Sequence, residues 1–267
     1  MFSGLREHEM RNNPCIIVLE QNCYVASCSC IGERGGRMAR TIGIGLQDFE
    51  KVISRNVFYV DKTMFIKEWW ESMDDVTLIT RPRRFGKTLT MSMIKHFFSV
   101  EYADSTLFQG MKIWKEDAYQ KLQGTYPVIF LSFAEIKKNN FKDTKNDIIS
   151  IINEAYKQHS YLIRSNVLTD AEKGIFDKFD NYSKDTDVSK EMSNEIVCRA
   201  IKDLSSMLCR HFGKKVIILL DEYDTPMQEA YVNGYWEELV GFTRSLFNST
   251  FKTNPYLERA IMTGITR

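Results

Sequence analysis

Four short apolar runs along the chain have the pattern of buried β-strands. They cover residues 76–80, 127–132, 216–220 and 259–264. Continuous apolar runs, unlike runs that alternate with polar residues, are typical of parallel strands covered on both faces. The pattern therefore predicts an α/β fold built on a mainly parallel sheet.

Amphipathic stretches between these runs have the period of helices that pack on a sheet. We predict helices over residues 46–55, 62–73, 143–164, 189–211 and 237–247, and one that starts at Leu89. Asp61 or Thr63 is expected to cap the second of them. Residues 165–188 are polar and rich in acidic side chains, which favours a variable insertion or lid.

The segment 81–88, with the sequence RPRRFGKT, joins the first apolar run to the helix that starts at Leu89. A loop that leads into a helix in this way points backbone N–H groups at an anion, and the helix dipole favours a phosphate there. In such a loop Lys87 reaches the β- and γ-phosphates, and the Thr88 hydroxyl binds Mg²⁺. On this segment alone, a basic surface loop remains the alternative.

The loop departs from the usual phosphate-loop pattern, G-x-x-x-x-G-K-[ST], at its first position. Arg81 stands where that pattern has its first glycine. Because Arg81 cannot adopt a positive φ cheaply, we expect the loop to open differently, with Pro82 stiffening the turn.

Two acidic residues follow the apolar run 216–220 directly. At the tip of a buried strand Asp221 can hold Mg²⁺, and Glu222 can orient and deprotonate an attacking water. Because the carboxyl ends of parallel strands form one edge of the sheet, this pair is predicted to lie near Lys87. The alternative is a solvated turn after a core strand.

Two further polar residues, Thr266 and Arg267, follow the run 259–264. From the tip of a strand, such residues can contact a γ-phosphate or the attacking water. The alternative, that Arg267 is merely a charged residue at the end of the chain, stays open.

Four segments of the chain resemble, in order, the signatures of the bacterial AAA-ATPase-like family. They are YVDKT at 59–63, RPRRFGKT at 81–88, LDEYDTP at 220–226 and TGITR at 263–267, and the resemblance spans roughly residues 42–267. That family has the loop without its first glycine. The resemblance implies a P-loop NTPase three-layer sandwich of the additional-strand type, with the sheet order second, third, fourth, first, then a fifth strand. Members often carry a C-terminal PD-(D/E)XK nuclease domain.

The resemblance also implies ATP and Mg²⁺ as ligands. The residues expected to bind the nucleotide are Arg83, Arg84, Phe85, Gly86, Lys87 and Thr88. The expected metal ligands are Thr88 and Asp221. Glu222 is expected to activate water, and Arg267 to stabilise the charge of the transition state.

The two ends of the chain depart from this picture. The chain stops three residues after the fourth run, which predicts a truncated protein without the fifth strand or the nuclease domain. We expect its first strand to be an uncovered edge, with low solubility and little turnover. Residues 1–37 hold four cysteines in a C-x7-C-x4-C-x-C spacing that fits zinc knuckles poorly. We expect them to be a disordered or misassigned extension ahead of a domain at 38–267.

The charge balance and the hydropathy of the chain indicate which partners and which location to expect. Lys and Arg number 36 against 35 Asp and Glu, a net charge of +1 that gives no sequence-wide attraction to nucleic acid. No apolar stretch reaches about 18 residues, so no membrane-spanning helix is expected. The first residues lack the pattern of a secretory signal, which favours a cytoplasmic location.

Two functions remain open from the sequence. One is Mg²⁺-dependent ATP hydrolysis that drives a conformational change, and the other is a nucleotide-gated switch without turnover. Contact with nucleic acid through Arg81, Arg83 and Arg84 is a weaker third. The sequence does not distinguish a homo-oligomer from a complex with an unknown protein partner.

Overall fold

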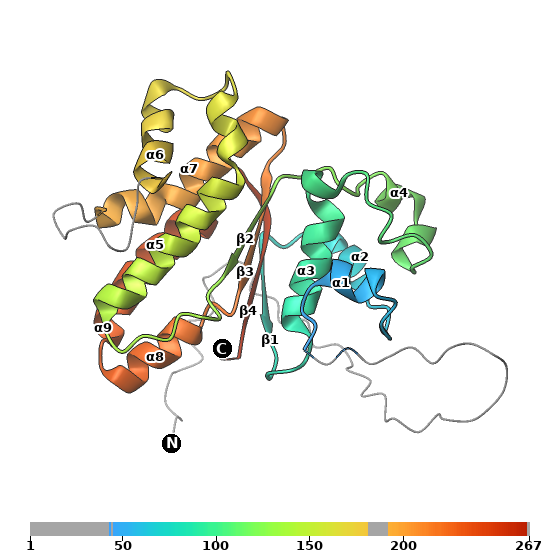
Figure 1. Cartoon of the computed structure of the whole chain (residues 1–267), viewed down its shortest axis with the longest axis horizontal. Coiled ribbons are helices and arrows are strands. Elements are labelled where there is room, and N and C mark those ends of the chain that lie inside the picture. The colour runs from blue at the N-terminus through green and yellow to red at the C-terminus, as the bar shows by residue number, and fades with distance from the viewer. Residues whose placement is uncertain (1–42, 44, 181–191, 266–267) are drawn as a thin grey trace.

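The computed structural model describes residues 43, 45–180 and 192–265, and its centre is a sheet of four parallel strands (Figure 1). The strands are β1 (Val76–Thr80), β2 (Val128–Ser132), β3 (Val216–Asp221) and β4 (Leu257–Gly264). Their spatial order is β1-β4-β3-β2. The four predicted strands and the predicted order among them are therefore confirmed.

The side chains of β3 alternate between two apolar cores, one on each face of the sheet. Ile218 and Leu220 belong to one core, and Ile217 and Leu219 belong to the other. Every residue of β3 is buried. This is the reason for its continuous apolar sequence, since a central parallel strand has both faces covered.

Helices cover both faces of the sheet (Figure 1). One side carries α1 (Phe49–Ser54), α2 (Met64–Glu71), α3 (Lys87–Phe98) and α4 (Asp117–Gln120). The other side carries α5 (Phe141–Gln158), α6 (Asp170–Asp180), α7 (Asn194–Phe212), α8 (Thr225–Asn233) and α9 (Trp236–Phe247). Shorter helical turns cover Val100–Tyr102, Ile113–Lys115, Ser160–Arg164 and Asn248–Lys252.

The predicted helices are present with shifted ends. The helix expected from Leu89 begins at Lys87, and the segment 143–164 divides into α5 and a 3-10 turn. The predicted insertion 165–188 contains α6, and its last residues lie outside the described part of the chain. Residues 1–37, with their cysteines, also lie outside it.

The prediction that Asp61 or Thr63 caps α2 is right in the position of Thr63 but wrong in the expected side-chain hydrogen bond. Thr63 takes the N-cap position, but its side chain makes no capping hydrogen bond. Instead the Asp61 carboxylate accepts hydrogen bonds from Thr63 and, over 2.8 Å, from the Lys112 N–H. Thr63 Oγ1 accepts from the Ile113 N–H over 3.2 Å. These bonds fasten the segment before α2 to the turn that follows Lys112.

The outer strands of the described sheet are β1, which pairs with β4, and β2, which pairs with β3. β1 is the shorter partner of its pair and leads directly to the loop predicted to bind phosphate. Among the helices of the described ranges, none combines the length and the apolar composition needed to cross a membrane.

Candidate functional site

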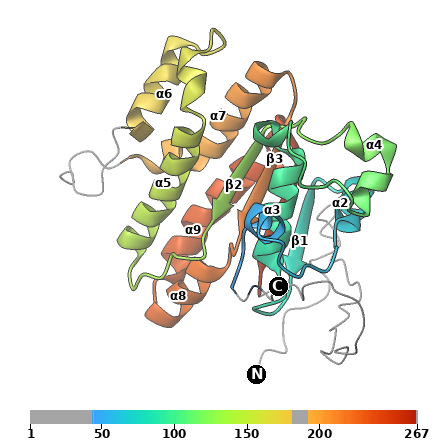
Figure 2. The ribbon, with the colours of Figure 1, turned by 45° about the vertical axis from the view of Figure 1, so that its right-hand side comes forward.

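Three strand ends meet at one edge of the sheet. β1 leads into the loop 81–86, β3 ends at Asp221 and β4 ends at Gly264. Parallel strands place their carboxyl ends together, and this edge is where open α/β sheets bind ligands. The Arg81 N–H donates to the Gly264 carbonyl over 3.3 Å, which ties the loop to β4. Figure 2 shows α3 starting from the loop at this end of the sheet.

The loop turns through left-handed backbone conformations late in its course. Arg84 has φ 70° and Gly86 has φ 78°, whereas Arg81 is not among the described residues with positive φ. Gly86 is the N-cap of α3, and glycine takes this conformation without steric cost. This agrees with the expectation that a loop without a first glycine opens differently.

Lys87 begins α3, and its side chain folds back into the loop. Nζ donates to the carbonyl oxygens of Arg81, over 2.8 Å, and Pro82, over 3.2 Å. The residue is only 8% exposed. An ammonium group at this depth needs such acceptors, because its water shell is largely removed. The loop therefore surrounds a fixed positive charge.

The next residue connects the loop to the acidic strand end. Thr88 Oγ1 donates to Asp221 Oδ2 over 2.8 Å, although the two residues are far apart in the sequence. Asp221 is fully buried, and its other oxygen accepts a hydrogen bond from the Thr263 hydroxyl. Mg²⁺ prefers oxygen ligands in proteins, and hydroxyl and carboxylate groups supply them. The residues present thus fit a magnesium ion.

Glu222 is held in a fixed position beside Asp221. Its backbone has φ 51°, unusual for a residue with a side chain. The Glu222 N–H donates to Thr263 Oγ1 over 3.1 Å, and its carboxylate accepts from Thr225 Oγ1 over 3.2 Å. The sharp turn after β3 therefore holds a half-buried carboxylate just beyond the strand end.

Two further residues take part in this edge, although the sequence patterns did not predict a role for them. Thr263 of β4 is fully buried and bonds both Asp221 and the backbone of Glu222. Asp224 is almost fully buried, and its Oδ2 accepts from the Ile265 N–H over 2.8 Å. Both residues lie inside the segments 220–226 and 263–267, and the family resemblance of these segments is the signal that could have pointed to them.

The structure gathers only part of the predicted site. Lys87, Thr88, Asp221 and Glu222 converge at the sheet edge, as their positions in the sequence predicted. The side chains of three predicted loop residues face solvent instead, namely Arg83, Arg84 and Phe85. Thr266 and Arg267 lie outside the described residues.

Comparison with known protein families gives one match over most of the chain. A family model described as "Predicted AAA-ATPase" matches residues 43–267. The chain belongs to the AAA-ATPase-like family. Membership indicates nucleotide binding or hydrolysis in general, and the sheet of parallel strands is compatible with a P-loop-like fold.

Beyond the family, the chain is similar to the "Uncharacterized protein in vnfD 5'region" of Azotobacter chroococcum mcd 1. The two are 22% identical over 234 residues, which cover 85% of this chain and 38% of that protein. The chain thus spans well under half of its relative's length. No solved structure matches the chain significantly.

A pocket of about 270 Å³ opens beside the first turn of α3. Its walls come from the loop before α1, from α1, from the segment before α2 and from the first turn of α3. The lining residues are Gly43, Leu46, Val52, Val57, Phe58, Tyr59, Val60, Lys62, Gly86, Leu89 and Thr90. The walls are mainly apolar. Tyr59 is one of the lining residues, and its burial raises the pKa of its hydroxyl to about 12. An AAA-ATPase-like chain thus has an apolar pocket directly next to its basic loop.

Proposed function

We propose that this chain binds MgATP at the carboxyl edge of its sheet and hydrolyses it, using the cycle to drive a conformational change. The observation that carries the proposal is the Thr88–Asp221 hydrogen bond beside the loop that encloses Lys87. The fold we infer is a P-loop NTPase core of the additional-strand type. Loop, hydroxyl, carboxylate and family membership all favour a nucleoside triphosphate over other anions.

Lys87 is the phosphate-binding side chain in this proposal. Its Nζ exchanges the carbonyl oxygens of Arg81 and Pro82 for β- and γ-phosphate oxygens, which carry full charge. The first backbone N–H groups of α3, which lack partners within the helix, add to the binding. Exposed Arg83 and Arg84 supply counter-charge from the outer side of the loop.

The base and ribose of the nucleotide occupy the pocket beside α3. Gly86, Leu89 and Thr90 line that pocket and also belong to the loop end and first turn of α3. A ligand with phosphates at the loop therefore reaches the pocket with its nucleoside. The apolar part of these walls suits the flat face of a base, and their polar groups can bond its edge or the ribose.

The acidic strand end supplies the remaining chemistry. Thr88 and Asp221 hold Mg²⁺, which neutralises phosphate charge when bound. Glu222 accepts the proton of the water that attacks the γ-phosphorus, as its place beyond the buried strand end allows. Arg267 is proposed to stabilise the charge that develops on the phosphate oxygens.

A nucleotide-gated switch without turnover is the second candidate. The observation that favours it is the closed state of the loop, in which Lys87 satisfies its own loop carbonyls. Nucleotide binding must break these bonds, so the loop differs between the free and the bound protein. Such a difference can be read by a partner even when hydrolysis is slow.

Calorimetric titration with MgATP tests the proposal. Lys87→Ala is expected to abolish measurable binding, because it removes the side chain that spans the phosphates. Lys95→Ala, near the far end of the same helix, is the matched control and is expected to bind like the parent. Thermal melting establishes that both variants are folded. Unchanged affinity in folded Lys87→Ala contradicts the phosphate-loop assignment, and turnover measured by phosphate release separates ATPase from switch.

A further inference from the structure

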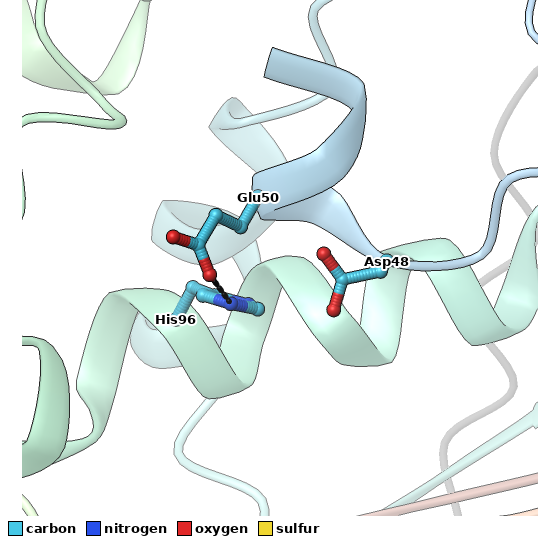
Figure 3. A group of neighbouring side chains, drawn as sticks. All are labelled: Asp48, Glu50 and His96. Atoms are coloured by element: carbon cyan, nitrogen blue, oxygen red, sulfur yellow. Dashed lines mark ion pairs between the residues drawn. The ribbon is translucent and has the colours of Figure 1, made fainter. Parts of the chain in front are cut away.

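Three side chains of types that can bind a metal ion meet where α1 packs against the last turn of α3. Asp48 precedes α1, Glu50 lies in its first turn, and His96 lies in the last turn of α3. Their ligand atoms all lie within 4.8 Å of one another. Figure 3 shows the carboxylates of Asp48 and Glu50 turned toward the ring of His96.

The ring of His96 is fixed so that one nitrogen faces this group. Nδ1 lies 2.7 Å from the Ser92 carbonyl oxygen. Because a carbonyl can only accept, Nδ1 carries the hydrogen, and Nε2 of the neutral ring has a free lone pair. His96 is only 3% exposed, and Nε2 lies 3.7 Å from Glu50 Oε2.

Three acceptor groups therefore point at one another across a small space. Two carboxylates and an imidazole lone pair repel unless a cation lies between them, either a metal ion or a proton on Nε2. A backbone carbonyl that holds Nδ1–H is the usual outer partner of a histidine that binds a metal. The geometry thus contains both a set of ligands and the contact that orients one of them.

A hydrogen bond joins the two elements that carry the ligands. The Phe49 N–H donates to Ser92 Oγ over 2.9 Å, which fastens the start of α1 to α3. Asp48 is the N-cap of α1, and its Oδ1 accepts from the Lys51 N–H over 2.8 Å. Its carboxylate is thereby oriented while one oxygen stays available. The three side chains are thus brought together by the packing of α1 on α3.

We propose that Asp48, Glu50 and His96 bind a divalent transition-metal ion of the Zn²⁺ class at the junction of α1 and α3. One imidazole and two carboxylates suit such an ion better than Mg²⁺ or Ca²⁺, which prefer oxygen ligands alone. Three protein ligands leave a position for water. His96 lies nine residues beyond Lys87 on α3, roughly 13 Å along the helix, so the site is separate from the nucleotide site.

The ion would brace one wall of the pocket. α1 contributes Val52 to the pocket, and α3 contributes Leu89 and Thr90. A metal bond between these helices limits their relative movement without touching the phosphate loop. Metal binding is therefore expected with or without nucleotide, and with or without an intact Lys87.

The test is a calorimetric titration of the full chain with ZnCl₂ after removal of metals by a chelator. Glu50→Gln and His96→Gln are expected to weaken one equivalent of Zn²⁺ binding by at least about tenfold. Asp48→Asn should do the same while keeping the helix cap, because asparagine also caps helices. Glu101→Gln, which changes a nearby exposed carboxylate, is the matched control and should bind like the parent.

Cobalt distinguishes this site from the six cysteines of the chain. Co²⁺ on nitrogen and oxygen ligands lacks the intense thiolate-to-cobalt absorption that cysteine ligands give. The proposal predicts one equivalent without that absorption, lost in Glu50→Gln and kept in Lys87→Ala. Because the Glu50 side chain is 57% exposed, this variant is expected to fold, so it decides the outcome if His96→Gln does not. Parent-like Zn²⁺ and Co²⁺ binding by folded Glu50→Gln overturns the proposal.

Discussion

The Thr263 hydroxyl donates a hydrogen bond to Asp221 Oδ1 and accepts one from the Glu222 N–H over 3.1 Å. A single side chain of β4 thus positions both acidic residues at the end of β3. The register places it there, because Leu220 pairs with Met262 and the next residue of each strand follows. The hydroxyl of Thr263 bonds Asp221 and Glu222, so its substitution tests how the acidic residues are positioned.

Thr263→Val is expected to destabilise the protein by about 1–3 kcal/mol, because it leaves a buried carboxylate oxygen without its donor. Mg²⁺-dependent ATP affinity should fall as well, since Asp221 loses its fixed orientation. Thr263→Ser keeps the hydroxyl and should retain most of both properties. Urea unfolding and calorimetry measure the two effects, and a parent-like Thr263→Val in both assays would show that the contact is unimportant.

Neutral variants of the two acidic residues should have different defects, one in nucleotide binding and the other in hydrolysis. Asp221→Asn is expected to weaken Mg²⁺-dependent ATP binding, because it removes the charge of the proposed metal ligand. Asp221 Oδ2 accepts a hydrogen bond from Thr88, the other proposed ligand. Glu222→Gln should bind MgATP like the parent but lose turnover by about 10²-fold or more. Phosphate release and calorimetry on the same samples decide this. Parent-rate hydrolysis by Glu222→Gln would refute its role as general base.

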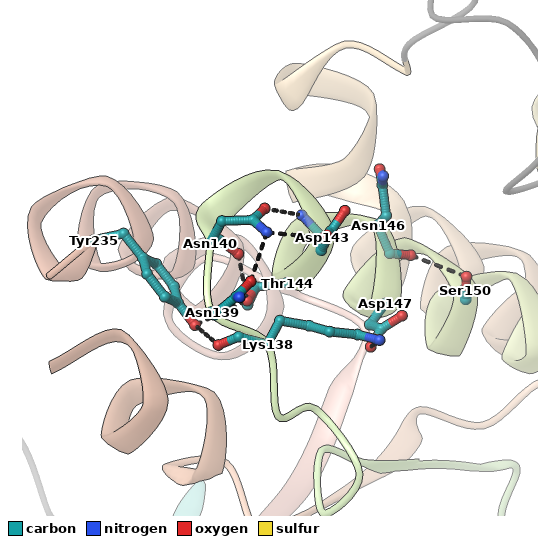
Figure 4. Close-up of polar contacts among 9 residues, drawn as sticks. All are labelled: Lys138, Asn139, Asn140, Asp143, Thr144, Asn146, Asp147, Ser150 and Tyr235. Atoms are coloured by element: carbon teal, nitrogen blue, oxygen red, sulfur yellow. Dashed lines mark hydrogen bonds and ion pairs between the residues drawn. The ribbon is translucent and has the colours of Figure 1, made fainter. Parts of the chain in front are cut away.

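The sheet could be predicted because its strands are covered on both faces, which leaves continuous apolar runs such as 216–220. The start of α5 was harder to predict. Asn140 caps that helix by accepting from the Asp143 N–H over 2.9 Å (Figure 4), but the apolar period becomes clear only later. Figure 4 also shows Tyr235 donating to the Lys138 carbonyl, a contact between α9's N-cap and the loop before α5 that no local pattern signals.

The candidate site was predictable where chemistry follows a strand end directly, as with Asp221, and where a loop precedes a helix, as with Lys87. It was not predictable where function depends on pairing between distant segments. Thr263 reads as one more core residue until β4 is placed beside β3. The group formed by Glu50 and His96 depends on the packing of α1 against α3, which the period of either helix leaves undefined.

Arg84 has a left-handed backbone conformation in the loop. The stability of its variants should therefore depend on how easily each new residue adopts that conformation. Arg84→Val is expected to cost about 1–2 kcal/mol of stability, because a β-branched side chain is poorly accommodated at a φ of 70°. Arg84→Gly should lie within about 1 kcal/mol of the parent, since glycine adopts this conformation freely.

Arg83→Val is the control for loss of charge at a neighbouring exposed position with ordinary φ. Chemical denaturation compares the three variants, and ATP titration shows whether either arginine contributes to binding. Equal stability of Arg84→Val and Arg84→Gly would mean that the loop relaxes to another backbone conformation in solution.

His159 should give the folded protein a defined loss of stability in mild acid. Burial, and then the charge of Lys95, lower the pKa of His159 from 6.5 to about 4. Between pH 6.5 and pH 4 the unfolded chain therefore binds a proton that the folded chain does not. The free energy of unfolding falls as the pH drops through this window, by up to about 1.4 kcal/mol per pH unit. Above pH 6.5 the histidine is neutral in both states, so none of this stability is lost there.

Urea unfolding at several pH values between 7 and 4.5 measures that slope. His159→Gln is expected to be less stable at pH 7, because the site is buried and Nδ1 lies 3.1 Å from the Tyr161 hydroxyl. Its stability should nevertheless depend less on pH, since glutamine does not titrate. His211→Gln changes an exposed histidine and should leave the slope contributed by His159 in place. An identical pH dependence in His159→Gln and the parent would show that folding does not lower the pKa of His159.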